Sequence, residues 1–299
     1  MANISVVINT INEEENIADA IDSVEDLADE VVVVDMESED KTVEIAKRMG
    51  AKVYSHKRTG YVEPARNFAI KKASGDWILI IDADERVPSK LAKVLKKYAE
   101  EGEKDYFAIP RKNIIFGKWI KNSRWWPDYN IRFFKKGKVT WSHIIHSVPE
   151  TRGVGADIAA EENMALTHYH YTSISQYIER MNRYTSHQAK DMLDGGYKFK
   201  WQDLLTKTSG EFFSRYFFGG GYKDGLHGLV VALLQLTSEI VKYVKVWEKQ
   251  GYIKENISVK DVINEMKKVQ KDANYWHADT LVILNGGVIH RLKRKFKLS

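Results

Sequence analysis

The sequence predicts an α/β fold, in which a mostly parallel sheet lies between helices and a mainly helical C-terminal region follows. Three observations support this prediction. Over the first hundred residues, short β-branched and aliphatic runs alternate with segments of helical spacing. The strand runs are apolar on both faces, as in parallel sheets that helices cover on both sides. From about Ser173 the pattern becomes mostly helical.

Each element of the first hundred residues follows from a local pattern. Runs such as residues 31–34, four valines, are typical of strands because β-branched side chains favour extended backbone. Asn12 and Asp40 can cap the helices after the first two strands, and Gly50 ends the second helix. In chain order we expect strand 4–8, a helix with apolar positions from Ile17 to Leu27, strand 31–34, helix 41–49, strand 52–54, helix 64–73 and strand 77–81.

Beyond about Asp105 the pattern changes. Two further strands are expected over 106–109 and 130–134, on either side of an aromatic, basic loop. Long helices are expected over 224–247 and 259–271. These patterns divide the chain into an α/β domain over residues 1–172, with halves of about 1–100 and 101–172, and a mainly helical region over 173–299.

The fourth strand ends in the acidic segment Asp82-Ala83-Asp84-Glu85. Side chains alternate along a strand, so Asp82 and Asp84 point the same way. Two neighbouring carboxylates repel each other unless a proton or a cation lies between them. The segment therefore favours a site for a divalent metal and a phosphate-bearing ligand, and a solvated acidic turn is the plain alternative.

Polar residues also follow the first two strands. Right-handed crossovers place the loops after parallel strands along one edge of the sheet, where ligands bind in open α/β folds. The residues collected at this edge are Asn9, Thr10, Asn12, Asp35, Glu37 to Asp40 and Asp82 to Glu85. The sequence has no G-x-G-x-x-G, P-loop or G-x-S-x-G motif. What remains is a nucleotide site built on acids and a metal.

Composition narrows the function further. The chain has no cysteine, which excludes disulfides, thiolate metal sites and Cys nucleophiles. Its N-terminus lacks the pattern of a signal peptide, and no apolar run approaches the ~20 residues of a bilayer span. We expect a cytoplasmic protein. The net charge is +5, but no DNA- or RNA-binding signature supports a nucleic-acid partner.

At this point the sequence resembles glycosyltransferase family 2, which has the GT-A fold. The opening strand and loop, the second strand with the segment after it, and the Asp82-Ala83-Asp84 motif are similar to that family's conserved blocks in order and spacing. The resembling segments are Ser5 to Glu14, Val32 to Asp35, Ser38 to Thr42, Ala65 to Asn67, Ala73 to Trp77 and Asp82 to Glu85. This resemblance covers about the first 150 residues.

The later part resembles one subgroup, the bacterial lipopolysaccharide core β-glucosyltransferases. The similar segments are Trp126-Pro127-Asp128, Arg132 to Phe134, His146 with Glu150, Tyr222 to Gly225 and Gly228-Leu229. The compact His-Glu pair of that subgroup is replaced here by a five-residue segment from His146 to Glu150. The identity of the general base therefore stays open.

The resemblance implies inverting transfer of a sugar, such as glucose, from a nucleotide-diphosphate donor to a hydroxyl of a glycan or lipid-linked acceptor. It implies donor contacts at Thr10, Asn12, Glu14, Asp35, Arg66 and Asp82, with Asp84 as a ligand of Mg²⁺ or Mn²⁺. Asp128 and Glu150 are equal candidates for the base, and His146 is a candidate metal ligand or orienting group. Ordinary turn, cap and ion-pair roles remain alternatives for Asp35, Arg66 and Asp128.

Two other functions compete with this interpretation. A nucleotidyltransferase also places acids beside a metal on a similar sheet, but it usually has a basic glycine-rich loop where this chain has an acidic one. A non-catalytic sugar- or lipid-binding module is the other alternative. Three features suggest contact with an anionic membrane surface, at the inner face of the cytoplasmic membrane: the five aromatic residues within 212–218, the helix over 224–247 and the basic segment from His290 to Leu298. A solvated tail and a helix packed in the core are the plain alternatives.

Overall fold

The computed structural model describes residues 2–58, 63–141 and 149–297. It divides into two compact units, and each is described by itself. The first contains residues 1–114 and 126–170, and the second contains residues 115–125 and 171–299.

The elements of the first unit are β1 Ile4–Thr10, α1 Ile17–Asp22, β2 Glu30–Asp35, α2 Thr42–Arg48, β3 Lys52–Ser55, α3 Glu63–Lys72, β4 Trp77–Asp82, β5 Glu85–Arg86, α4 Ser89–Glu101, β6 Tyr106–Ile115, β8 Asp128–Lys135, β9 Val139–Thr140, β10 Glu150–Thr151, β11 Gly155–Asp157 and β12 Leu166–Tyr171.

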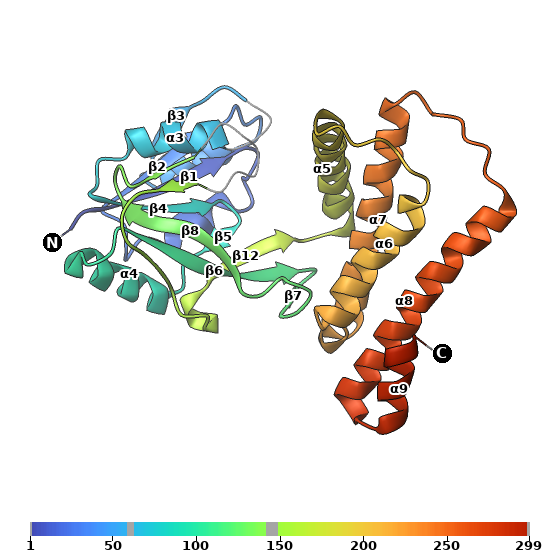
Figure 1. Cartoon of the computed structure of the whole chain (residues 1–299). Helices are drawn as coiled ribbons and strands as arrows, with labels where there is room; N and C mark the ends of the chain where they lie inside the picture. The colour runs from blue at the N-terminus through green and yellow to red at the C-terminus, as the bar shows by residue number, and fades with distance from the viewer. Residues whose placement is uncertain (1, 59–62, 142–148, 298–299) are drawn as a thin grey trace. The chain divides into compact units, whose positions relative to one another are not determined.

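The main sheet has the strand order β3-β2-β1-β4-β8-β6-β12-β5 (Figure 1). Strands β3, β2, β1 and β4 are parallel, as expected, whereas β8 runs antiparallel to both β4 and β6. The carboxyl ends of β1, β2 and β4 therefore meet at one edge. The predicted α/β class is confirmed.

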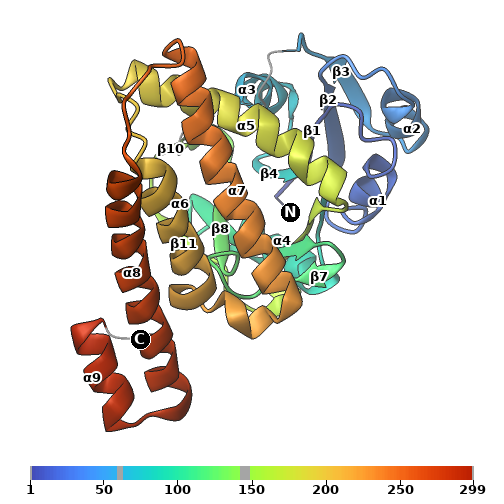
Figure 2. The ribbon, with the colours of Figure 1, turned by 90° about the vertical axis from the view of Figure 1, so that its right-hand side faces the viewer.

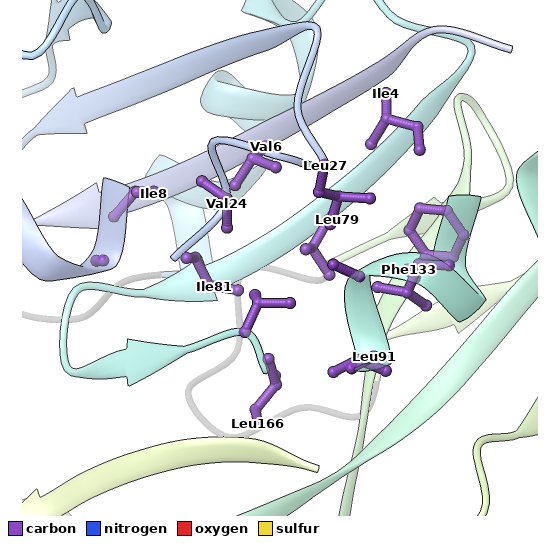
Figure 3. Close-up of a cluster of buried hydrophobic side chains, with 14 of the residues drawn as sticks. Ile4, Val6, Ile8, Val24, Leu27, Leu79, Ile81, Leu91, Phe133 and Leu166 are labelled. Atoms are coloured by element: carbon purple, nitrogen blue, oxygen red, sulfur yellow. The ribbon is translucent and has the colours of Figure 1, made fainter. Parts of the chain in front are cut away.

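Two apolar clusters hold the sheet. On one face, Ile4, Val6, Ile8, Leu79 and Ile81 pack against α1 and α4, and Val24, Leu27, Leu91, Phe133 and Leu166 belong to the same cluster (Figure 3). On the other face, Val7, Val34 and Ile80 pack with Ala65 and Ala69 of α3. Alternating residues of one strand thus serve both layers, which explains why these strands are apolar throughout.

Three details of the prediction are corrected. Helix α1 begins at Ile17, and Asn12 lies before it in a left-handed conformation, with φ of 53°, instead of capping it. Helix α4 was not predicted, although Leu91, Ala92, Leu95 and Ala99 bury one side of it. The final predicted helix continues past Lys271 to Asn285, because no glycine or proline occurs before Gly286.

The second unit is helical apart from short segments, as expected. Its elements are β7 Lys118–Trp119, α5 Ile174–Asp194, α6 Asp203–Phe213, a π-helical turn Ser214–Phe218, a 3₁₀ turn Gly221–Asp224, α7 Leu226–Lys249, α8 Val259–Asn285 and α9 Val288–Phe296. Helices α8 and α9 form a hairpin (Figure 2). Among the helices of the described ranges, none combines the length and apolar content that a bilayer span requires.

Candidate active site

The sheet register places the predicted residues side by side. Asn9 lies opposite Asp82 across the β1–β4 pair, and Thr10 lies opposite Asp35 across the β1–β2 pair. Because the strands are parallel, all four residues lie at the carboxyl edge. This edge is the starting point for the site.

Hydrogen bonds join the loop after β1 to the loop after β2. The Oδ1 atom of Asn12 accepts the backbone N–H of Glu39, and Asp35 accepts both the hydroxyl and the N–H of Ser38. Glu14 accepts the N–H of Lys41 at 3.0 Å. The predicted base-contacting residues therefore gather in one loop cluster, where their side chains also fix the shape of both loops.

Asp82 lies between two guanidinium groups. Its Oδ1 is 3.1 Å from Nη2 of Arg66 on α3, and its Oδ2 is 2.6 Å from Nη2 of Arg132 on β8. Burial alone would raise the pKa of Asp82, but the charges on Arg132 and Arg66 outweigh it and hold that pKa well below its usual range. Asp82 therefore stays ionised and is a poor proton acceptor.

The ion pairs continue toward Asp128. Nη2 of Arg132 also lies 3.0 Å from Oε1 of Glu85, which is fully buried. Arg111 on β6 lies 3.6 Å from the same Glu85 oxygen and donates from Nε to Oδ2 of Asp128 at 2.9 Å. We call this set the charge network: Arg66, Asp82, Glu85, Arg111, Asp128 and Arg132. Three guanidinium groups balance three carboxylates in it, so each charge has a partner when water is excluded.

A polar chain joins Asp128 to Asp84. Asn113 on β6 is buried, and its Nδ2 donates to Oδ2 of Asp128 at 3.1 Å. Its amide oxygen therefore faces Nδ1 of His168 on β12, 2.6 Å away. An amide oxygen only accepts hydrogen bonds, so Nδ1 of His168 carries the proton. The other ring nitrogen, Nε2, faces Oδ2 of Asp84 at 3.5 Å and Nδ1 of His170 at 3.2 Å.

This geometry fits a metal ligand pair. A nitrogen lone pair and a carboxylate oxygen repel each other unless a proton or a cation lies between them. Imidazole nitrogen and carboxylate oxygen are both ligands of Mn²⁺, and carboxylate oxygen suits Mg²⁺. Among the described residues, no set of three His, Asp or Glu side chains could hold an ion alone. Metals that also bind phosphate usually take only one or two protein carboxylates, so two ligands from this chain are sufficient.

Several buried polar atoms at the same edge have no hydrogen-bond partner among the described residues. They are both amide atoms of Asn9, Oγ1 of Thr10 and Nε of Arg66. By alternation, Asn9 shares its face of β1 with Val7, which packs against α3, the helix that carries Arg66. An unpaired buried polar group costs about 1–3 kcal/mol, so a polar ligand at this edge would relieve a real cost.

Two predicted residues lie elsewhere. Glu150 is exposed on β10, which pairs with β9 in a separate two-stranded sheet, and within the described residues it is not part of the charge network. His146 lies outside the described residues. Sequence reasoning gave no role to Arg111, Asn113 and Arg132. The signal that could have found the first two is polar side chains at alternating positions of a buried strand.

Comparison with known proteins identifies the family of the chain. The sequence model of Glycosyl transferase family 2 matches residues 5–156, half of the chain. An uncharacterized glycosyltransferase of Rickettsia typhi is 32% identical over 287 residues, which cover 90% of this chain and 98% of that protein. The lipopolysaccharide core biosynthesis glycosyltransferase LpsC of Rhizobium meliloti is 24% identical, over 87% of this chain and 97% of that protein.

A solved structure shows a more limited likeness. Glucosyl-3-phosphoglycerate synthase of Mycobacterium tuberculosis, crystallised with Mn²⁺, UDP and glucosyl-3-phosphoglycerate, is 29% identical over 38% of this chain and 44% of that one. Its TM-score is 0.32, so the assignment rests on the family match and the sequence relatives. On those grounds the chain belongs to glycosyltransferase family 2 and is a glycosyltransferase of the GT-A fold.

Proposed function

We propose that this glycosyltransferase moves a hexose, with inversion, from a nucleotide-diphosphate donor such as UDP-glucose to a hydroxyl of a glycan or lipid-linked acceptor. The observation that carries the proposal is the facing pair of Asp84 and His168 beside the charge network. The pair supports a cation site beside fixed positive charges, at the edge where the loops after β1 and β2 lie. The relationship to LpsC supports an acceptor in cell-envelope polysaccharide or lipopolysaccharide.

In this proposal Asp84 and His168 hold Mg²⁺ or Mn²⁺. When bound, the ion neutralises charge on the departing nucleoside diphosphate. Arg66 donates its unpaired Nε–H to the same diphosphate, and Asp82 fixes the orientation of that guanidinium. Asn12 and Asp35 contact the base from the loop cluster, together with Thr10 and Glu14.

Asp128 is the base that we propose, in preference to Glu150. Arg111 and Asn113 hold its Oδ2, and its Oδ1 lies 3.2 Å from the amide of Asn130. In the reaction Oδ1 takes the proton of the acceptor hydroxyl as the new bond from its oxygen to C1 forms. The bond from C1 to the diphosphate oxygen breaks, and its electron pair leaves with the nucleoside diphosphate.

The test is turnover of UDP-glucose by the full chain, with water or a sugar as acceptor, during titration with Mn²⁺. We expect Asp84→Ala to abolish metal-dependent turnover and His168→Ala to raise the Mn²⁺ requirement. Asp128→Asn should lower kcat by about 10²–10⁴ without changing that requirement, because it removes only the base. Glu150→Gln, the matched carboxylate change, should have a much smaller effect.

Three results would count against the proposal. Full turnover after chelation would make the metal assignment wrong. A larger loss in Glu150→Gln than in Asp128→Asn would exchange the two base candidates. Stabilisation of the fold by UDP-glucose with Mn²⁺, but no turnover with any acceptor, would indicate a binding protein.

A further inference from the structure

Helix α9 presents an apolar stripe on its outer side. Ile289, Leu292 and Phe296 are spaced i, i+3 and i+7, so they lie on one side of the helix. Their exposed fractions are 69%, 51% and 60%. Ile283 and Leu284, at the end of α8, are exposed by 63% and 58% next to the turn that joins the two helices. Large apolar side chains gathered in this way need a partner.

The opposite side of α9 is fixed to α8. Nη1 of Arg294 lies 2.9 Å from Oδ1 of Asp279, and Nζ of Lys297 lies 2.9 Å from Oδ1 of Asp272. Both views of the chain show the two helices side by side (Figures 1 and 2). These contacts settle which side of α9 faces outward.

Positive charge borders the apolar stripe on both sides. At 100° per residue, Arg291 and Lys295 fall along one border of the stripe, and Lys293 falls along the other. From Thr280 to Lys297 the chain carries five Lys and Arg residues and no acid. An apolar stripe between rows of cations is the pattern of helices that lie in the surface of an anionic bilayer.

We infer that the outer side of α9, with the end of α8, is a docking surface for an anionic lipid bilayer. The apolar side chains enter the region between headgroups and acyl chains, and the flanking cations contact the acidic headgroups. The inference deepens the proposed function, because a lipid-linked acceptor would be met at this surface. The argument for the surface itself rests only on the α8–α9 hairpin.

The test is cosedimentation of the full chain with vesicles of phosphatidylcholine, with and without phosphatidylglycerol. We expect at least about tenfold tighter binding to the anionic vesicles, and a decline with salt. Leu292→Ser with Phe296→Ser should weaken binding to both kinds of vesicle. Arg291→Gln with Lys295→Gln should remove about tenfold of the preference for phosphatidylglycerol.

The matched control is Lys267→Gln with Lys271→Gln, which removes the same charge from exposed positions on α8. This variant should bind like the wild type, and far-UV circular dichroism checks that every variant is folded. Wild-type binding in both α9 variants would overturn the inference. The inference would also be overturned if the wild type were a dimer and the variant Leu292→Ser with Phe296→Ser were a monomer, because the apolar stripe would then join two copies of the chain. UDP-glucose hydrolysis, measured on the same samples, should be the same in these variants as in the wild type. A failure of the proposed reaction can therefore be distinguished from a failure of membrane binding.

Discussion

Asp82 and Asp84, two residues apart, have different neighbours, and the roles that we propose for them differ for this reason. Asp82 is neutralised by Arg66 and Arg132, whereas Asp84 faces the imidazole of His168. The motif alone could not distinguish them, because the two arginines and the histidine come from α3, β8 and β12. The two carboxylates differ in the side chains that surround them: guanidinium groups contact Asp82, and an imidazole faces Asp84.

Asn113 is the residue on which the proposed metal pair depends. Asn113→Ala removes the acceptor that fixes the proton of His168 on Nδ1, so Nε2 is no longer held ready for a metal. Loss of such an outer partner usually weakens metal affinity about 10–100-fold, and we expect the Mn²⁺ requirement to rise in that range. Stability should fall by about 1–3 kcal/mol because buried partners lose a hydrogen bond.

Asn130→Ala is the matched control for this change. Asn130 also hydrogen-bonds Asp128, at Oδ1 and at the backbone carbonyl, and within the described residues its side chain makes no hydrogen bond to His168. It should alter kcat more than the Mn²⁺ requirement. Equal shifts of the Mn²⁺ midpoint in the two variants would mean that Asn113 acts only through Asp128 or through general loosening of the site.

At the scale of elements, Glu30 joins the starts of three strands at the edge opposite the site. It is the first residue of β2, its Oε1 accepts the hydroxyl of Ser5 on β1, and it also accepts the N–H and the hydroxyl of Ser74, before β4. The neighbouring Gly75 has no room for a side chain, since a Cβ there would lie 2.7 Å from Oγ of Ser5 and 2.8 Å from the carbonyl of Asn3. This close packing aligns β1, β2 and β4.

Glu30 should make the stability of this sheet depend on acid. Burial alone would raise its pKa, but hydrogen bonds from Lys52, Ser5 and Ser74 lower it from 4.5 to about 2. The pKa of the folded state is thus below that of the unfolded chain. The contribution is complete above about pH 4.5 and is lost as the pH falls toward 2, with an upper limit of about 3 kcal/mol.

Urea unfolding of wild type and Glu30→Gln between pH 7 and pH 3 measures this contribution. We expect the difference in unfolding free energy to be largest at neutral pH and to shrink steadily below about pH 4.5. Comparing the two proteins at each pH cancels the other carboxylates. A difference that stays constant over this range would show that Glu30 stabilises the strands by packing and not by charge.

At the scale of the whole molecule, local signals could be predicted and distant pairings could not. The strands and their acidic ends were predictable because β-branched runs and turn acids are features of neighbouring residues. The charge network and the polar chain beside it could not be predicted, because their partners are far apart in the sequence. Arg132 and Glu85 are separated by 47 positions, and Asn113 and His168 by 55. Helix α9 was expected as a basic segment but not as a helix, since its ion pairs to α8 are tertiary.

The segment 115–125 shows the same limit for domain boundaries. Ile115 and Ile120 are buried in a cluster with Tyr177, Met181 and Val231, all from helices beyond residue 172. The backbone N–H of Asn122 donates to the buried carboxylate of Asp224 at 2.9 Å, and Ser123 donates its N–H to the carbonyl of Gly219. The fold of this segment therefore depends on residues of the C-terminal helices.

A fragment that ends at residue 172, the boundary expected from the sequence, should accordingly expose the apolar side of 115–125. We expect it to bind a hydrophobic dye and to self-associate, whereas the full chain does neither to the same degree. Replacing 115–125 in the fragment by a short Gly-Ser linker between β6 and β8 should restore a monomer, because these strands are antiparallel neighbours and a short connection can join them. If the unmodified fragment were monomeric and did not bind the dye, segment 115–125 would fold with the α/β unit. The domain boundary would then lie at residue 172.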